Sequence, residues 1–348
     1  MIAVQEVAEA IRKGAAAGRS ALVGRVIDVT GFSTMPVDEL IAIESDGSQH
    51  GEILGRPGAE RLGVAAAEMF GSGASALQAV AVEIHGKEVE EVGLSCGGRA
   101  EVLLQAADAI PSHLWDLLAN RAPAALITRI DGPGAGPSAV VVDRDGRSWG
   151  ELSGGAGGVG LRDDAVALLF GGRSARRRVE DEQGVVLIEA WVPAPRLVVV
   201  GTGDMVGAVA AQGALLGWDT KATDTAGEVE GLLDWAGATA ALIVLSHDPH
   251  VDAPALAIGL ARRIPYVGAM GSRSTQSRRS DRLSADGVST DDLARMHRPI
   301  GLDLGGRRAP EVALAIAAEI LACHCGREAR PLRDTTGPIH DRIGPVRR

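Results

Sequence analysis

Apolar runs of strand length alternate with helix-length segments in the C-terminal part of the chain. The runs at 197–200 (LVVV) and 240–245 (AALIVL) are apolar at every position, which indicates strands buried on both faces. Strands that alternate with helices are typical of a parallel sheet covered on both sides. We therefore predict a Rossmann-like α/β domain. Its predicted strands are 196–200, 218–223, 240–245 and 264–268. The first predicted helix follows the first strand and ends near 216, and the later helices lie around 228–235, 254–263, 277–285, 291–296 and 310–321.

The N-terminal half repeats one pattern of apolar strands and turns. Residues 20–70 and 122–172 each read as a strand, a glycine-containing loop, a second strand, an Asp-Gly turn, a short strand and a helix. The turns, Asp46-Gly47 and Asp145-Gly146, are strong signals of a β-hairpin. The repeat predicts an α+β domain with a duplicated hairpin–helix unit. Outside the two copies we expect an N-terminal amphipathic helix with Val4, Val7, Ala8 and Ile11 on one side, strands at 80–84 and 101–105, and a helix at 111–120.

Two prolines mark the boundary between these patterns. Pro193 and Pro195 are two residues apart, and neither a sheet ladder nor a helix continues through such a pair. We predict an N-terminal domain over residues 1–192 and the Rossmann-like domain over residues 193–326. Residues 327–348 are polar, with Arg, Gly and Pro, and are predicted to form a tail.

Charge and cysteine content narrow the class of protein. The formal net charge is −10, which argues against nucleic acid as a partner because phosphate binding needs a basic surface. The 3 Cys are too few for a disulfide framework and fit a reducing compartment. The N-terminal segment lacks the order of features of a signal peptide, and the apolar runs are too short to span a bilayer. We expect a cytoplasmic protein without membrane contact.

A glycine-rich turn follows the first strand of the predicted Rossmann-like domain. Gly201 permits a tight turn, and Gly203 leaves room for a phosphate at the N-terminus of the next helix. Asp224 follows the second strand, where a carboxylate can accept hydrogen bonds from a ribose diol. Two alternatives stay open: the glycines can serve close strand–helix packing, and Asp224 can be a solvated strand end. Gly207 comes one residue later than the dinucleotide-binding fingerprint requires.

Polar and glycine-rich residues also follow the later strands, where open α/β sheets bind their ligands. His247 is a candidate acid, base or ligand-orienting group, or a hydrogen-bond partner within its own turn. Arg273 is a candidate anion contact, whereas the arginines at 278, 279 and 282 are predicted to lie on a solvated helix face. The candidate binding residues at this edge are Gly201, Gly203, Asp224, His247, Asp248, Gly271, Ser272, Arg273 and Asp303.

Cys96 stands in a glycine-rich segment of the N-terminal domain and is followed by Gly97 and Gly98. Flanking glycines leave a thiol accessible, which suits a thiolate that reacts or binds a soft metal. The alternative is an inert, small apolar side chain. Cys323 and Cys325 flank a histidine at the end of the last predicted helix, and the sequence offers no second ligand pair for a zinc site there. Cys96 is therefore the candidate reactive residue.

Five blocks of the sequence combine glycine with polar or reactive residues. They are GLSCGG at 93–98, GTGD at 201–204, LSHDP at 245–249, YVGAMGSR at 266–273, and PIGLDLGGR at 299–307 with APE at 309–311. Together these blocks closely resemble the XdhC/CoxI family, and the last two are the most specific. The resemblance covers most of the chain and is strongest from 195 to 321. It implies an accessory protein of xanthine dehydrogenase, carbon monoxide dehydrogenase or a related molybdenum hydroxylase, which binds the molybdenum cofactor, assists its sulfuration and delivers it to the apoenzyme.

The resemblance also implies roles for residues and partners. The family's Cys-Gly-Gly cysteine corresponds to Cys96, which is then expected to hold the cofactor through molybdenum, as molybdopterin or its dinucleotide form. The expected partners are a molybdenum hydroxylase apoenzyme, a cysteine desulfurase and a second copy of this chain, and the protein is expected to be a maturation chaperone rather than an enzyme. An NAD(P)- or FAD-dependent oxidoreductase is the first alternative, indicated by the glycine turn and Asp224. A non-catalytic partner-binding protein is the second, because residues 54–60 lack the cysteine of the family's Ser-Gly-Gly-Cys-x-Glu element.

Overall fold

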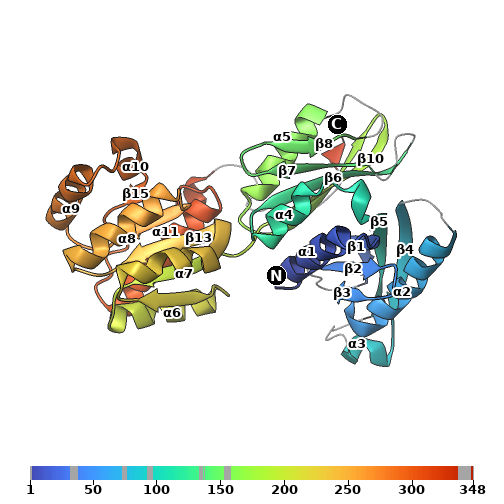
Figure 1. Ribbon diagram of the computed structural model, residues 1–348, viewed down its shortest axis with the longest axis horizontal. Coiled ribbons are helices and arrows are strands. Elements are labelled where there is room, and N and C mark those ends of the chain that lie inside the picture. The colour runs from blue at the N-terminus through green and yellow to red at the C-terminus, as the bar shows by residue number, and fades with distance from the viewer. Residues whose placement is uncertain are drawn as a thin grey trace. The chain divides into compact units, whose positions relative to one another are not determined.

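The computed structural model describes residues 2–31, 38–72, 77–91, 97–132, 136, 138–152, 158–335 and 346–347. The chain forms two compact units (Figure 1). The first unit holds the residues up to Val192 together with a short strand, β16 (Val346–Arg347), and the second begins at Pro193. Each unit is described by itself below.

The first half of the N-terminal unit is an antiparallel sheet with helices on its two faces. The strand order is β3-β2-β1-β5-β4. The Asp46-Gly47 turn joins β2 to β3, as the hairpin signal predicted. The elements are α1 (Ile2–Ala16), β1 (Ala21–Thr30), β2 (Leu40–Glu44), β3 (Gln49–Gly51), α2 (Gly55–Ser72), β4 (Leu77–Ile84), α3 (Lys87–Glu91) and β5 (Gly98–Ala106).

The second half repeats this arrangement in the same register. The strand order is β16-β9-β10-β6-β7-β8, in which β8-β7-β6-β10-β9 corresponds to β3-β2-β1-β5-β4. Val23 of β1 lies opposite Ala42 and Gln105, and Leu126 of β6 lies opposite Val141 and Glu189. The elements are α4 (His113–Ala119), β6 (Ala124–Asp131), β7 (Ala139–Asp143), β8 (Ser148–Gly150), α5 (Gly158–Leu169), β9 (Ala175–Asp181) and β10 (Gly184–Trp191).

The predicted duplication is confirmed, and it is larger than the sequence pattern indicated. The segments that we placed between or outside the copies belong to them, because each copy begins with a helix (α1 or α4) and ends with a strand pair (β4–β5 or β9–β10). We did not predict the β9–β10 pair from the sequence, because the arginine-rich sequence of β9 lacks the apolar alternation of an ordinary strand.

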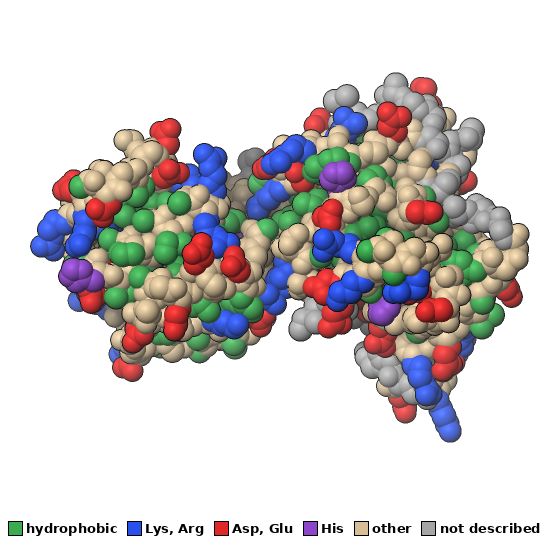
Figure 2. Space-filling view, viewed as in Figure 1, with side chains coloured by type: hydrophobic (Ala, Val, Ile, Leu, Met, Phe, Trp, Pro, Cys, Tyr) green, Lys and Arg blue, Asp and Glu red, His purple; other side chains and the backbone are tan. Residues whose placement is uncertain are grey.

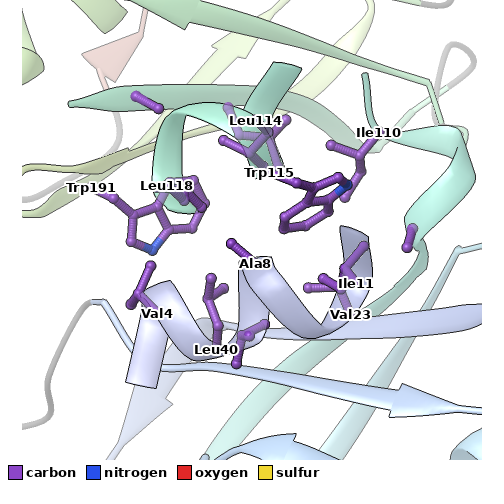
Figure 3. Packing of buried hydrophobic residues seen from close by; sticks show 14 of the residues in the cluster. Val4, Ala8, Ile11, Val23, Leu40, Ile110, Leu114, Trp115, Leu118 and Trp191 are labelled. Carbon is purple, nitrogen blue, oxygen red and sulfur yellow. The ribbon is translucent and has the colours of Figure 1, made fainter. Parts of the chain in front are cut away.

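The two copies bury a common core between them. Helices α1 and α4 pack against each other, and Val4, Val7, Ala8 and Ile11 of α1 are all buried, as the amphipathic pattern predicted. Figure 3 shows α1 facing the side chains of Leu114, Trp115 and Leu118 on α4. Strand residues from both sheets complete this core, and the outer faces of the sheets pack on α2 and α5. Folding of one copy therefore depends on the other.

A buried ion pair also joins the copies. The Arg25 guanidinium on β1 donates to the carboxylate of Glu189 on β10 and to the side chain of Gln105 on β5. The side chains of Arg25 and Glu189 are 1% and 2% exposed. Arg176 of β9 lies 3.4 Å from the second oxygen of the Glu189 carboxylate. Gln105 and Glu189 occupy equivalent positions in the two copies, so Arg25 bridges matching sites of the duplicated unit.

The second unit is the predicted Rossmann-like domain, with a parallel sheet in the order β12-β11-β13-β14-β15. Alternate residues of β11 face opposite sides of the sheet: Val198 and Val200 pack under α7 and α8, and Leu197 and Val199 pack under α6 and α11. The elements are β11 (Arg196–Val200), α6 (Asp204–Leu215), β12 (Thr220–Thr223), α7 (Val229–Ala236), β13 (Ala240–Val244), α8 (Pro249–Ala261), β14 (Tyr266–Ala269), α9 (Arg273–Ala285), α10 (Thr290–Ala294), β15 (Met296–His297) and α11 (Ala309–His324).

Two details differ from the sequence-based expectation. The helix expected over 291–296 ends at Ala294, and Met296 begins β15, which is too short to produce an apolar run. The predicted tail contributes β16, which pairs with β9 of the N-terminal unit. Backbone pairing of this kind depends little on side-chain pattern, so a polar composition did not reveal it.

On the face shown in Figure 2, Lys and Arg side chains are interspersed with Asp and Glu side chains. Within the described residues, no helix has both the length and the apolar character needed to cross a membrane.

Candidate functional site

The candidate site is the carboxyl edge of the parallel sheet in the second unit. The chain runs from β11 through α6 to β12 on one side, and then crosses to β13 on the other side of β11. This reversal makes the ends of β11 and β13 the switch point at which open α/β sheets bind ligands. Helices α6, α8 and α9 all begin at this edge, so their unpaired N–H groups and positive dipole ends gather there.

Gly201 lies where the loop after β11 contacts the end of β12 and the segment after β13. Its N–H donates to the Thr223 carbonyl at the end of β12 over 2.8 Å, and its φ is +145°. A Cβ at this position would lie 3.2 Å from Leu245 Cβ and from Ser246 N, both in the segment that ends β13. Gly201 therefore permits the loop after β11 to approach the segment that follows β13 closely.

Gly203 has a different role. It precedes α6 with a φ of +86°, and a Cβ added to it or to Gly207 would meet no atom of the described residues within 4 Å. Close packing against the strand comes later in the helix, where a Cβ on Gly213 would lie 3.0 Å from Leu197 Cδ1. The space next to Gly203 is open, which is the condition for a phosphate to approach the helix N-terminus.

Carboxylates flank the glycine turn. Asp224 follows β12 directly and is exposed, and its Oδ1 accepts a hydrogen bond of 3.1 Å from the Thr225 hydroxyl. Asp204 is the first residue of α6 and is also exposed. A negative side chain at a helix N-terminus stabilises the helix, which gives Asp204 a structural role that does not need a ligand.

The segment after β13 caps the helix α8. Asp248 is the N-cap of α8, and its carboxylate accepts the His250 N–H over 2.8 Å. The Ser246 hydroxyl accepts the Asp248 N–H over 3.1 Å. His247 lies between them and is exposed. Asp248 is therefore held by its capping contact, whereas His247 faces solvent at the edge.

The segment after β14 likewise caps the helix that follows it, α9. Ser272 is the N-cap of α9 and its hydroxyl accepts the Thr275 N–H over 3.3 Å. Gly271 precedes the cap with a φ of +134°. Arg273 is exposed in the first turn of α9. A cation in that position, beside unpaired N–H groups, favours an anionic ligand.

Arg279 corrects our expectation of a solvated helix face. It is 5% exposed, and its guanidinium contacts the Asp252 carboxylate at 3.1 Å through Nε and 2.6 Å through Nη2. It also donates to the Met270 carbonyl at 3.0 Å and the Ser246 carbonyl at 3.5 Å, so it ties together the loops after β13 and β14. The buried residues Gln276, Arg279 and Leu283 follow helical spacing, and this is the sequence signal that we missed.

Asp303 lies in the segment between β15 and α11, which the carboxylate of Glu311 orders. Glu311 accepts the N–H groups of Arg307 and Arg308 at 2.9 and 3.1 Å. These two hydrogen bonds lower the pKa of Glu311. Asp303 itself is exposed. The Gly-rich block thus ends in a capped helix and leaves Asp303 accessible.

The other candidate residues belong to the N-terminal unit. Gly98 is the first residue of β5 and pairs with Ile84 at the end of β4, and Gly97 precedes it. Cys96 and the segments at 32–37, 73–76 and 153–157 lie outside the described residues. Within the described part of the chain, no group of three or more His, Cys, Asp or Glu side chains is arranged to hold a metal ion.

The carboxyl edge combines a glycine turn with open space, capped helix N-termini and an exposed arginine. These groups can bind phosphate or another anion. Of the candidate acid and base residues after β13, Asp248 is engaged with backbone and His247 is exposed.

Comparison with known families and proteins agrees with the resemblance inferred from the motifs. Residues 197–320 match the family model of the XdhC Rossmann domain. This segment contains all of β11 but its first residue, the glycine turn and every candidate residue of the carboxyl edge. The predicted family resemblance is confirmed over these residues.

Two proteins of Escherichia coli (strain K12) are similar to the chain. The uncharacterized protein YqeB is 28% identical over 233 residues, which cover 57% of this chain and 43% of YqeB. The molybdenum cofactor insertion chaperone PaoD is 27% identical over 137 residues, which cover 39% of this chain and 42% of PaoD. The matched region is thus less than half the length of either relative. A crystal structure of a xanthine dehydrogenase from Bacillus halodurans aligns over 93% of this chain and 97% of its own, with 17% identity and a TM-score of 0.47.

Proposed function

We propose that this protein is an accessory factor that binds the molybdenum cofactor and assists its maturation and insertion into a molybdenum hydroxylase. The observation that carries the proposal is that the open carboxyl edge lies within the residues that match the XdhC Rossmann domain. The similarity to the insertion chaperone PaoD supports the same role. An exposed binding edge suits a carrier, because a carrier must release its ligand unchanged.

The proposal gives the two units separate roles. The carboxyl edge of the second unit fits the phosphate of a pterin or of its dinucleotide form, because Gly203 leaves open space at the N-terminus of α6 and Arg273 adds a positive charge. In the N-terminal unit, the Cys96 thiolate is a ligand of the right softness for molybdenum. The cofactor itself supplies the metal and the dithiolene chemistry, and the chain binds and orients it.

The test is the cofactor content of protein purified from cells that make the cofactor. We expect molybdenum by mass spectrometry and pterin by fluorescence in equal molar amounts. Cys96→Ser should lose molybdenum and keep its thermal stability. Arg273→Glu should weaken pterin binding roughly 10- to 100-fold, the effect of losing one charged hydrogen bond.

Two variants serve as controls. Arg278→Glu makes the same charge change on the exposed side of α9, one turn away from the edge, and should keep wild-type binding. Cys325→Ser removes a thiol outside the proposed ligand set. Wild-type protein that carries neither molybdenum nor pterin, together with unchanged molybdenum-hydroxylase activity after deletion of the gene, would contradict the proposal. Maturation by Cys96→Ser at the wild-type level would instead favour a non-catalytic partner-binding protein.

Sulfuration and assembly are finer parts of the proposal. We include a cysteine desulfurase and a molybdenum hydroxylase apoenzyme among the partners, and a homodimer as the working form. Affinity copurification with each partner and light scattering of the purified protein test these parts independently of cofactor content.

A nucleotide-dependent oxidoreductase remains the second candidate because of one local feature. Asp224 follows β12 next to the glycine turn, and the Gly201 N–H bonds to the end of that strand. A carboxylate there is suited to the ribose of NAD(P) or FAD. Calorimetric titration with NAD⁺, NADP⁺ and FAD tests it: saturable binding that Asp224→Ala abolishes would support this candidate, and no heat from any of the three would exclude it.

A further inference from the structure

A cysteine, a histidine and a glutamate meet on the face of the parallel sheet that α11 covers. Cys323 and Glu319 are one helical turn apart on α11, and His297 is the last residue of β15. The His297 Nε2 atom lies 3.9 Å from Cys323 Sγ, and its Nδ1 atom lies 3.2 Å from Glu319 Oε1. The imidazole therefore stands between a thiol and a carboxylate, with one ring nitrogen directed at each.

The carboxylate is held firmly in this arrangement. Glu319 Oε2 accepts a hydrogen bond of 2.5 Å from the Tyr266 hydroxyl and one of 2.8 Å from the Gly301 N–H. The Tyr266 ring stacks on the His297 ring at 4.4 Å between centroids. Burial opposes ionisation of Glu319, but its hydrogen bonds to His297, Tyr266 and Gly301 outweigh burial and lower its pKa. Glu319 is thus ionised at neutral pH and fixes the orientation of the histidine.

An ionised Glu319 also selects the tautomer of His297. The Nδ1–H donates to the carboxylate, which leaves the Nε2 lone pair directed toward the thiol. Burial and the Glu319 charge raise the pKa of the Cys323 thiol, so the thiol stays protonated at neutral pH and needs a base to react. A nucleophile, a base and a group that orients the base are the parts of a nucleophilic triad.

The chemistry of this triad is limited by the groups around it. Acyl transfer needs donors that stabilise an oxyanion, in addition to the nucleophile and base. Displacement at sulfur needs only a thiolate, access to the attacked sulfur and a good leaving thiol. Cys323 is half-buried at the end of α11 and remains partly accessible to solvent. Sulfur transfer is therefore the reaction that the observed groups can perform by themselves.

We propose that Cys323, His297 and Glu319 form a sulfur-accepting triad that takes the terminal sulfur atom from a persulfide donor. His297 Nε2 removes the proton of the Cys323 thiol, and Sγ attacks the terminal sulfur of the donor R–S–SH. The donor S–S bond breaks as the new Sγ–S bond forms, and the electron pair leaves on R–S⁻, which takes the proton from the His297 imidazolium. The products are Cys323–S–SH and R–SH, with no net oxidation. This inference does not depend on the proposed cofactor-binding function, because none of its three residues is among the candidate binding residues of the carboxyl edge or lies in the Cys96 segment.

Glutathione persulfide is the probe that tests the triad. Mass spectrometry of the digested protein should find a gain of one sulfur atom on Cys323, and quenched time points give the rate. His297→Gln should lower that rate by about 10²-fold, the lower end of what a general base supplies. Cys323→Ser should abolish the modification of this peptide. His324→Gln, at the last residue of α11, and Cys325→Ser, at its C-cap, are matched controls and should keep the wild-type rate.

The pH dependence of the wild-type rate gives a second readout that needs no variant. From about pH 6 to pH 9, general-base catalysis predicts a rate that levels off before the thiol itself ionises. A rate that rises tenfold per pH unit throughout this range would show that the free thiolate reacts without a base. That result, a wild-type rate in folded His297→Gln protein, or equal sulfur on Cys323 and Cys325 would overturn the proposal.

Discussion

Glu39, just before β2, is a carboxylate held in an unfavourable environment. It is largely buried, the Leu54 N–H donates to it, and its Oε2 atom has no hydrogen-bond partner among the described residues. Burial, together with the nearby charges of Asp38 and Glu52, raises its pKa from 4.5 to about 7, against the attraction of Arg176. The folded state therefore binds the Glu39 proton more tightly than the unfolded state does.

This raised pKa predicts a pH-dependent effect of Glu39→Gln. The tighter proton binding stabilises the fold below about pH 4.5, and this stabilisation is lost as the pH rises to about 7. A neutral glutamine avoids the loss. We expect the melting temperature of Glu39→Gln to exceed that of the wild type at pH 8 and the difference to shrink toward pH 5. Glu68→Gln, at an exposed position of α2, is the control. An equal shift at both pH values would contradict the assignment.

At the scale of elements, the contacts of Arg279 connect α9, α8 and the loops after β13 and β14. One buried guanidinium contacts Asp252, Gln276, Met270 and Ser246. The edge residues His247 and Arg273 sit in segments that these contacts hold. The candidate site thus rests on a buried internal ion pair.

Arg279→Met should destabilise the protein by about 3–5 kcal/mol, because it leaves the Asp252 carboxylate buried without its counter-charge. The double variant Arg279→Met with Asp252→Leu should recover part of this loss, since it removes both charges. Urea unfolding measures each free energy. Arg278→Met, on the exposed side of the same helix, should change stability by less than about 0.5 kcal/mol. A double variant no more stable than Arg279→Met would show that the cost does not come from the unpaired charge.

At the scale of the whole molecule, the N-terminal unit is one folding unit made from two equivalent copies. The common core joins α1 and β1 of the first copy to α4, β6 and β7 of the second. The Arg25–Glu189 ion pair joins the sheets near the same place. Neither copy can bury its inner face without the other.

Glu189→Ala tests this dependence between the copies. The change removes the carboxylate that both Arg25 and Arg176 face, and we expect a loss of about 3–5 kcal/mol. Hydrogen exchange should show β1 of the first copy and β10 of the second losing protection by the same amount. Asp163→Ala, at an exposed position of α5, should leave both strands protected. Loss of protection in β10 with β1 unchanged would show that the copies fold independently.

Periodicity in the sequence by itself determined most of the elements. Apolar strands buried on both faces, Asp-Gly turns and the amphipathic N-terminal helix are local patterns, and each was found where we predicted it. The family resemblance of residues 197–320 was also readable from the sequence, because the motifs at strand ends have fixed spacing. The roles proposed for the candidate site residues, Cys96 above all, stay predictions.

Tertiary structure decided the rest, because it depends on residues that are distant in sequence. The full extent of the duplication became visible only through strand pairing, and β16 pairs with a strand more than a hundred residues away. The arginines at 278, 279 and 282 were predicted to lie on a solvated helix face, whereas Arg279 pairs with the buried carboxylate of Asp252 on another helix. Likewise the sequence offered Cys323 only as a zinc ligand without a second ligand pair, because the histidine beside it and the tyrosine stacked on that histidine come from β15 and β14. Local sequence patterns determine the helices and strands, whereas the packing of these elements against one another determines which charged and reactive side chains meet.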